Sequence, residues 1–173
     1  MNCFINDKIL LIDEDTFKSM VPSARNITDT QTLYYIITMS QNQSIKGLLG
    51  KDFYDDLIEK YDEYINSGGT LTDCYDELIH NYLQPILSFS VYKRLINHLS
   101  FKLKEGGLRY SIDQTTELAD INDRSSIISE INNDINVIIS DMNDYIYDNR
   151  DCFPLFKFKY PKDETSLFRI GKL

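Results

Sequence analysis

Hydrophobic residues recur at helical spacing over most of the chain. The longest such pattern covers residues 73–99, where apolar side chains follow one another in steps of three and four residues: Leu78, Tyr82, Ile86, Phe89, Tyr92, Ile96 and Leu99. A second apolar stripe lies beside the first: Leu83, Leu87, Val91 and Leu95. Because a helix that is apolar around most of its circumference is usually surrounded by other helices, we expect residues 73–99 to form the central helix of a bundle. Pro85 removes one backbone hydrogen bond and predicts a kink near residues 81–84.

A second long helix is predicted from residue 123 to about residue 148. Its apolar positions follow steps of three and four: Ile128, Ile131, Ile135, Ile138, Met142 and Tyr145. A seam of this kind is typical of a helix that packs lengthwise against another long helix. The natural partner is the central helix, so we expect the two to form the framework of the bundle.

Three shorter helices are predicted before the central one. Asp13 is a suitable N-cap for a helix from residue 14 to about residue 20. Thr28 or Thr30 begins a helix that runs to about residue 46, and residues 51–66 form the next, which ends at Ser-Gly-Gly. The fold class is therefore all-α.

The pattern changes after residue 99. Residues 101–104 and 108–112 each alternate between apolar and polar side chains, and Gly106 and Gly107 lie between them. Two short alternating stretches around a glycine turn predict a β-hairpin, which is followed by a polar loop over residues 113–122.

Residues 153–173 differ from the rest in composition. Two prolines interrupt them, lysines are interspersed, and their large apolar residues include Phe153, Phe156, Phe158, Tyr160, Phe168, Ile170 and Leu173. We therefore divide the chain into a helical domain, residues 1–152, and a C-terminal arm, residues 153–173. The arm either folds back over its own domain as a strap or docks on a neighbouring chain through its aromatic side chains.

Charge is unevenly distributed along the chain, which has a net charge of −9. Residues 51–77 contain nine acidic and two basic side chains, and residues 113–151 contain ten and two. Residues 93–110 carry five basic side chains and one acidic, and residues 157–173 carry five and two. One interpretation is that these are solvated helix faces; the other is head-to-tail contact between copies through opposite charges.

Overall composition narrows the class of protein. The hydrophobic content of 42% is sufficient for a core, and no apolar stretch has the length of a membrane helix. No basic region followed by an apolar stretch lies near residue 1, so we expect no secretion signal. The three cysteines (Cys3, Cys74 and Cys152) are far apart, which favours reduced thiols in a cytoplasmic protein. A strongly acidic chain is also a poor candidate for binding nucleic acid by phosphate neutralisation.

The sequence contains no recognisable catalytic motif. His80 and His98 lie about 27 Å apart along one helix, and no Cys or His pair has the spacing of a zinc site. There is no glycine-rich phosphate loop and no nucleophile motif. We therefore expect no enzymatic activity, no metal and no cofactor.

Several landmarks together carry a resemblance to a known family. They are SQNQSIKGLLGKDFYDDL after the second helix, YDELIHNYLQPILSFSVYKRLINHL in the central helix, the Gly-Gly turn with its polar loop, and a last long helix that ends in DCFPLFKF. Over about residues 8–158 the chain resembles the all-helical head–tail connector (adaptor) proteins of tailed bacteriophages, in particular those of crAss-like phages.

The resemblance implies a structural virion protein. Connectors of this kind form a homo-oligomeric ring, expected as a dodecamer, which binds the portal protein beneath the capsid vertex and meets tail or further neck proteins. The ring continues the DNA channel, so that DNA passes through without specific binding during genome ejection. The resemblance places the protein in the neck of the virion and, during assembly, in the host cytoplasm. It implies no contact with a membrane. No catalytic residue comes with the family.

Two segments are candidates for the contacts of such a ring. They are the hairpin region and the C-terminal arm, with these candidate interface residues: Lys102, Lys104, Arg109, Tyr110, Phe153, Phe156, Phe158, Tyr160, Phe168 and Ile170. Alternative functions are a non-enzymatic helical-bundle protein that binds or regulates a partner, and a small cytoplasmic enzyme whose site is too diffuse to see in the sequence.

Overall fold

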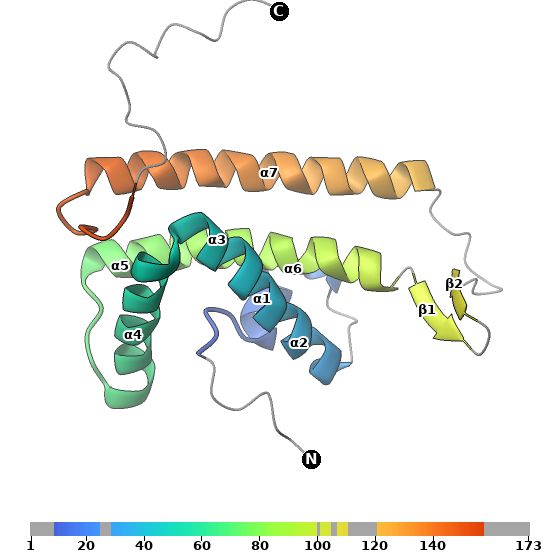
Figure 1. Ribbon diagram of the computed structural model, residues 1–173, viewed down its shortest axis with the longest axis horizontal. Coiled ribbons are helices and arrows are strands. Elements are labelled where there is room, and N and C mark those ends of the chain that lie inside the picture. Colours follow the sequence, from blue (N-terminus) through green and yellow to red (C-terminus); the bar gives the residue numbers. More distant parts are fainter. Residues whose placement is uncertain (1–8, 25–28, 100, 105–106, 111–120, 158–173) are drawn as a thin grey trace, which may run out of the picture.

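The computed structural model describes residues 9–24, 29–99, 101–104, 107–110 and 121–157, and these residues are mainly helical (Figure 1). The elements follow in this order: α1 (Glu14–Met20), η1 (Pro22–Ala24), α2 (Thr30–Ser40), η2 (Gln41–Ile45), α3 (Lys46–Leu49), α4 (Lys51–Ser67), α5 (Asp73–Glu77), η3 (Leu78–Leu83), α6 (Gln84–Leu99), β1 (Phe101–Lys104), β2 (Gly107–Tyr110) and α7 (Ile121–Asp148).

Short polar side chains determine where the first helices begin. The Asp13 carboxylate accepts a hydrogen bond from the Thr16 backbone N–H at 2.7 Å and caps α1, as predicted. For α2 the cap is Asp29, which accepts from the Thr32 N–H at 3.0 Å, rather than either expected threonine. At the end of α4, Gly68 adopts a left-handed conformation with φ +66°, which a glycine adopts without the steric cost of a side chain.

The predicted central helix consists of three consecutive elements, α5, η3 and α6. The middle element, η3, is a π-helix that ends two residues before Pro85. Proline has no N–H to donate and its ring crowds the carbonyl four residues earlier, so a wider turn just before it relieves the clash. The irregular backbone includes residues 81–83, where the proline predicts a kink.

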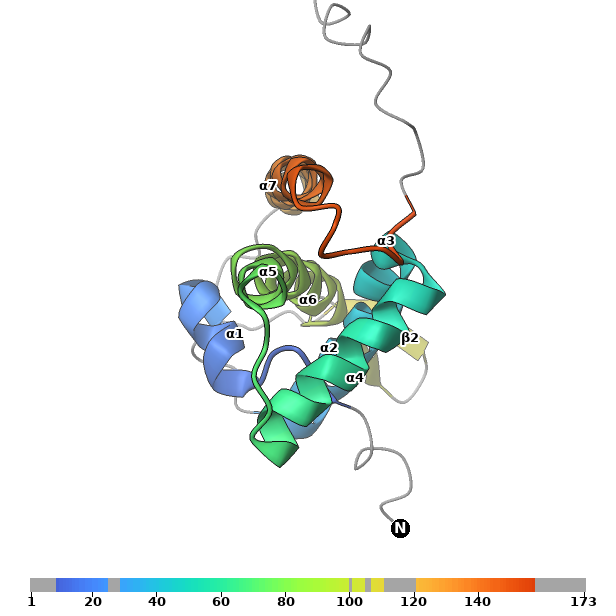
Figure 2. The ribbon, with the colours of Figure 1, turned by 90° about the vertical axis from the view of Figure 1, so that its left-hand side faces the viewer.

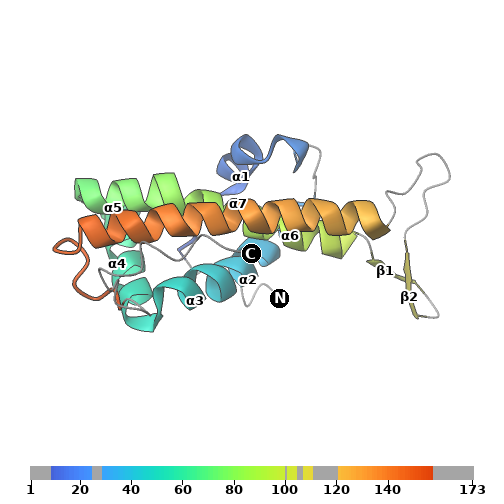
Figure 3. The same ribbon diagram turned by 90° about the horizontal axis from the view of Figure 1, so that it is seen from above.

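Three layers of helix lie against one another. The α5–η3–α6 stretch is in the middle, α7 runs along one side of it, and α2 crosses on the other (Figures 1 and 2). Seen from above in Figure 3, α7 follows the central stretch along its length. Of the predicted seam on α7, Ile131 and Met142 are buried, and Ile135, Ile138 and Tyr145 are half-buried against the core.

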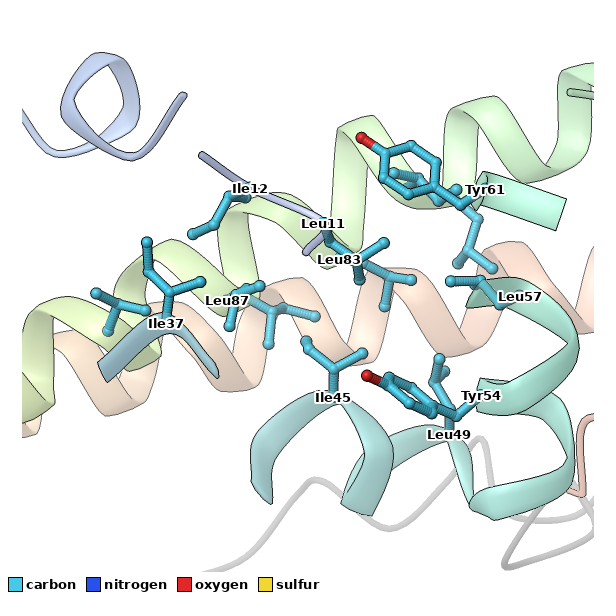
Figure 4. Packing of buried hydrophobic residues seen from close by; sticks show 14 of the residues in the cluster. Leu11, Ile12, Ile37, Ile45, Leu49, Tyr54, Leu57, Tyr61, Leu83 and Leu87 are labelled. Atoms are coloured by element: carbon cyan, nitrogen blue, oxygen red, sulfur yellow. The ribbon is translucent and has the colours of Figure 1, made fainter. Parts of the chain in front are cut away.

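The main core lies between the central stretch and the N-terminal half of the chain. Leu83 and Leu87 of the middle layer meet Ile37 of α2 and Ile45 of η2, and Leu57 contributes from α4 (Figure 4). All five side chains are fully buried. Burial of this kind supplies most of the stability of such a bundle, at roughly 1.5–3 kcal/mol for each large apolar side chain.

Two buried glutamines hold the extended segment that precedes α1. The Gln41 amide donates to the Ile9 carbonyl and accepts from the Leu11 N–H, both at 2.8 Å, and Gln84 donates to the Leu11 carbonyl at 2.8 Å. Because buried backbone groups need partners, these bonds allow Leu11 and Ile12 to enter the core in an extended conformation.

Candidate interaction surfaces

The first candidate surface is the pair of strands that follows α6 at one end of the molecule (Figure 1). β1 and β2 are antiparallel, with Phe101 opposite Tyr110 and Lys102 opposite Arg109. Three basic candidate residues, Lys102, Lys104 and Arg109, therefore belong to one short two-stranded unit, together with Tyr110. The local alternation around the two glycines predicts this grouping.

The second expected surface is the C-terminal arm, and its first residues pack against the helices instead of forming a separate arm. After α7 the chain turns back through hydrogen bonds from Cys152 N–H to Asn149 O and from Phe156 N–H to Phe153 O. Phe153 is 2% exposed, and its ring centroid lies 5.2 Å from that of Tyr75.

The ring of Phe53 lies within 6 Å of both arm aromatics, with centroids 5.8 Å from Phe153 and 5.5 Å from Phe156. Phe153 and Phe156 thus pack on their own chain, where Phe153 is buried and Phe156 is half-buried. Burial removes Phe153 from the accessible surface of the monomer, whereas a contact of Phe156 with a second chain stays a prediction. The boundary between residues 152 and 153 does not separate two structural units, because Phe153 belongs to the core of the helical domain. The remaining arm residues of the interface prediction, Phe158, Tyr160, Phe168 and Ile170, lie outside the described residues.

Two further contacts hold this return segment. Cys74 at the start of α5 and Cys152 form a disulfide across 78 residues of sequence, with their Cα atoms 6.5 Å apart. The expectation of three reduced, unpaired thiols is therefore wrong for these two, because helix packing brings together cysteines that are distant in sequence. Lys157 then forms an ion pair with Asp52, in the first turn of α4, at 3.0 Å.

A third surface is an acidic stripe along α7, which we define as five exposed carboxylates in steps that keep to one side of the helix: Glu130, Asp134, Asp141, Asp144 and Asp148. Val137, at the remaining position of the same stripe, is 60% exposed. The stripe lies away from the buried Ile131 and Met142. The apolar seam was evident in the sequence, whereas the stripe was seen there only as an excess of acidic residues.

A fourth surface is a groove of about 540 Å³ beside α4, which we call the α4 groove. Its apolar lining comes from Ile9, Leu10, Tyr54 and Ile58, and its acidic lining from Asp55, Glu59 and Asp62. Hydrogen bonds from Lys51, at 2.7 Å, and from Lys46 hold the pKa of Asp55 below its usual value, so this carboxylate is ionised at neutral pH.

A fifth surface, of about 580 Å³, lies between α3, α6 and α7 and includes Leu48, Ile86 and Ile135. Its charged lining residue is Lys93, which donates to Asn132 at 2.9 Å. Of the residues that the structure describes, no carboxylate lines this second groove, in contrast to the α4 groove.

Among the described residues, no group of three His, Cys, Asp or Glu side chains is placed to hold a metal ion. No helix in that part of the chain is long and apolar enough to cross a membrane.

Comparison with known proteins identifies one family. No curated protein and no solved structure matches the chain significantly. A family model described as a family of unknown function (DUF6712) matches residues 45–166, from η2 through the whole of α7 and beyond. Since this match covers more than half of the chain, the protein belongs to the DUF6712 family.

Proposed function

We propose that this protein is a structural virion component that forms a ring in the neck of a tailed bacteriophage. The ring joins the portal vertex to the tail and continues the DNA channel. Each subunit is a helical bundle built on the α5–η3–α6 stretch and α7. The observation that carries the proposal is the separation of charge between the acidic stripe on α7 and the basic β1–β2 unit, which lies past the end of α6.

This separation suits head-to-tail association. A ring needs two different faces on each subunit, and opposite charges on those faces favour the correct register and disfavour a symmetric dimer. In the proposed contact, Lys102, Lys104 and Arg109 of one subunit meet the acidic stripe of the next.

The net charge of −9 is consistent with a channel that does not hold DNA. Binding to the duplex depends mainly on Lys and Arg side chains that replace counterions at the phosphates. A ring whose subunits are acidic overall offers little of this attraction, so a duplex can pass through it.

A charge-swap experiment tests the proposal. The purified chain, alone and with a portal ring, is measured by multi-angle light scattering and electron microscopy. Reversing the stripe with Asp134→Lys and Asp141→Lys should prevent ring formation, and so should Lys102→Glu with Arg109→Glu. A chain carrying all four changes should assemble again, because each contact regains opposite charges.

The possible results separate two kinds of failure. If every charge-reversed variant still forms rings, other surfaces make the contact between subunits. A chain that remains a monomer in the presence of portal would contradict the ring itself.

The second candidate function is a non-enzymatic helical-bundle protein that binds a partner. The α4 groove favours it, because the groove combines apolar walls with three carboxylates on one accessible surface. A monomer that binds one partner segment through Glu59 and Asp62 would support this function instead of the ring.

A further inference from the structure

The walls of the α4 groove are fixed by buried hydrogen bonds. Gln41 donates to the Tyr54 hydroxyl at 2.9 Å and to the Ile9 carbonyl at 2.8 Å. The Gln41 side chain therefore joins the extended segment that precedes α1 to α4. Ile9 and Leu10 form one wall of the groove, and Tyr54 and Ile58 form the other. Because the walls are already ordered, binding of a segment costs less conformational entropy.

The lining chemistry specifies the kind of segment that fits. Apolar walls favour large apolar side chains, while Asp55, Glu59 and Asp62 favour basic ones. Since Asp55 already has Lys46 and Lys51 as partners, Glu59 and Asp62 are the carboxylates that most directly recognise a new base. The groove thus fits a basic segment rich in apolar residues.

Residues 158–173 of this chain have that composition. They contain six large apolar side chains and one proline, and four bases against two acids: Phe158, Tyr160, Leu167, Phe168, Ile170, Leu173 and Pro161, with Lys159, Lys162, Arg169 and Lys172. Each groove has one lysine in its lining, Lys46 in the α4 groove and Lys93 in the groove between α3 and α7. The latter groove is a poorer match, because among the described residues no carboxylate lines it.

The point at which the described chain ends brings this segment to the α4 groove. The ion pair of Lys157 with Asp52 places residue 157 at the first turn of α4. From Asp52 to Asp62 the helix rises only about 15 Å, whereas 16 residues can span up to about 50 Å. Attachment so close by gives the segment a high effective concentration at its own groove.

We propose that residues 158–173 dock in the α4 groove of their own chain. In this arrangement the C-terminal segment continues the return that Phe153 and Phe156 begin, and its lysines and arginine face Glu59 and Asp62. The inference stands whether or not the protein forms a ring.

Photo-crosslinking in the full chain tests the docking. A photoreactive benzoyl-phenylalanine is placed at Phe168, the chain is irradiated, and the products are mapped by gel electrophoresis and peptide mass spectrometry. We expect an intrachain crosslink, in the monomer band, to the α4 peptide that contains Tyr54, Ile58 and Asp62.

Matched charge variants give the control. Glu59→Lys with Asp62→Lys should reduce the yield of this crosslink about fivefold, as expected for the loss of two exposed ion pairs, and added salt should reduce it further. Glu63→Lys changes an exposed acid on the same helix that is not part of the groove, and should leave the yield unchanged. Circular dichroism of all variants should show the helix content of the parent, so that a lower crosslink yield does not reflect unfolding.

Three results would overturn the proposal. A crosslink found in a dimer band would place the segment on a second copy, and a crosslink outside the groove would place it on another surface. The third result compares two chains, one with the photoreactive group at Phe4 and one with it at Phe168. If the group at Phe4 crosslinks to the groove and the group at Phe168 does not, the groove holds residues 1–8 instead.

Discussion

The central stretch and α7 have similar apolar spacing but very different surroundings. Leu83, Leu87 and Val91 of the central stretch are fully buried, with α2 on one side and α7 on the other. In the part of the chain that the structure describes, α7 is covered on one side, and Val137, on its other side, is 60% exposed. The difference shows that the number of apolar stripes, more than their spacing, distinguishes a helix inside a bundle from one on its surface.

This difference also separates stability from function. Changes in the central stretch act on the whole core, whereas the outer side of α7 can change its charge at little cost to folding. We therefore expect the same substitution to destabilise the fold strongly in the central stretch and hardly at all on the outer side of α7.

The largest effect is expected for Leu87→Asp in α6. This side chain is 0% exposed, and a carboxylate there has no partner, so the change should cost several kcal/mol and unfold a domain of ordinary stability. Urea denaturation followed by circular dichroism measures it.

Val137→Asp on α7 is the matched control. It introduces the same carboxylate at an exposed position, so its free energy of unfolding should stay within about 0.5 kcal/mol of the parent. If both variants unfold alike, the outer side of α7 is covered by something that the present arrangement does not include.

The sequence predicted the features that depend on local spacing. Asp13 caps α1 through a residue three positions away, and the strands β1 and β2 are joined across two residues. The two apolar stripes also identified the central stretch correctly as the interior of the bundle. Each of these features follows from side chains that lie within a few turns of one another.

Contacts between distant parts of the chain could not be predicted. Gln84 meets the Leu11 carbonyl across 73 residues, and Cys74 meets Cys152 across 78. Phe153 was expected on an interface because its own segment combines large apolar residues with lysines and prolines, yet its burial depends on Phe53 and Tyr75 from two other helices. No local pattern specifies which aromatic residues will meet in this way.

A smaller effect is expected for Cys152→Ser, which removes the covalent link between α5 and the segment after α7. In the absence of reductant the variant should be less stable by about 2–4 kcal/mol, since the disulfide closes a long loop. The comparison uses urea denaturation of both proteins with and without dithiothreitol.

With dithiothreitol the parent should lose this advantage and approach the variant. Phe153 should stay buried in both, because its contacts with Phe53 and Tyr75 do not need the disulfide. A parent whose stability does not respond to reductant would show that the disulfide contributes little to holding α7 against the central stretch.

The smallest effect concerns Tyr145, which joins α7 to α5 by donating a hydrogen bond to the Cys74 carbonyl at 3.1 Å. Burial, followed by the negative charge of Glu77, raises the pKa of Tyr145 to about 12, compared with about 10 in an unfolded chain. Because the folded state holds this proton more tightly, its contribution to stability is complete below about pH 10 and is lost as the pH rises toward 12.

Tyr145→Phe should therefore cost about 1 kcal/mol at pH 8, where the hydrogen bond is intact, and clearly less at pH 11. Burial also raises the pKa of Tyr75, so the parent and the Tyr145→Phe variant both lose some stability at alkaline pH. The informative quantity is therefore the difference between their free energies of unfolding. A difference in unfolding free energy that is the same at both pH values would show that Tyr145 titrates normally and that this end of α7 is as open to solvent as its outer side.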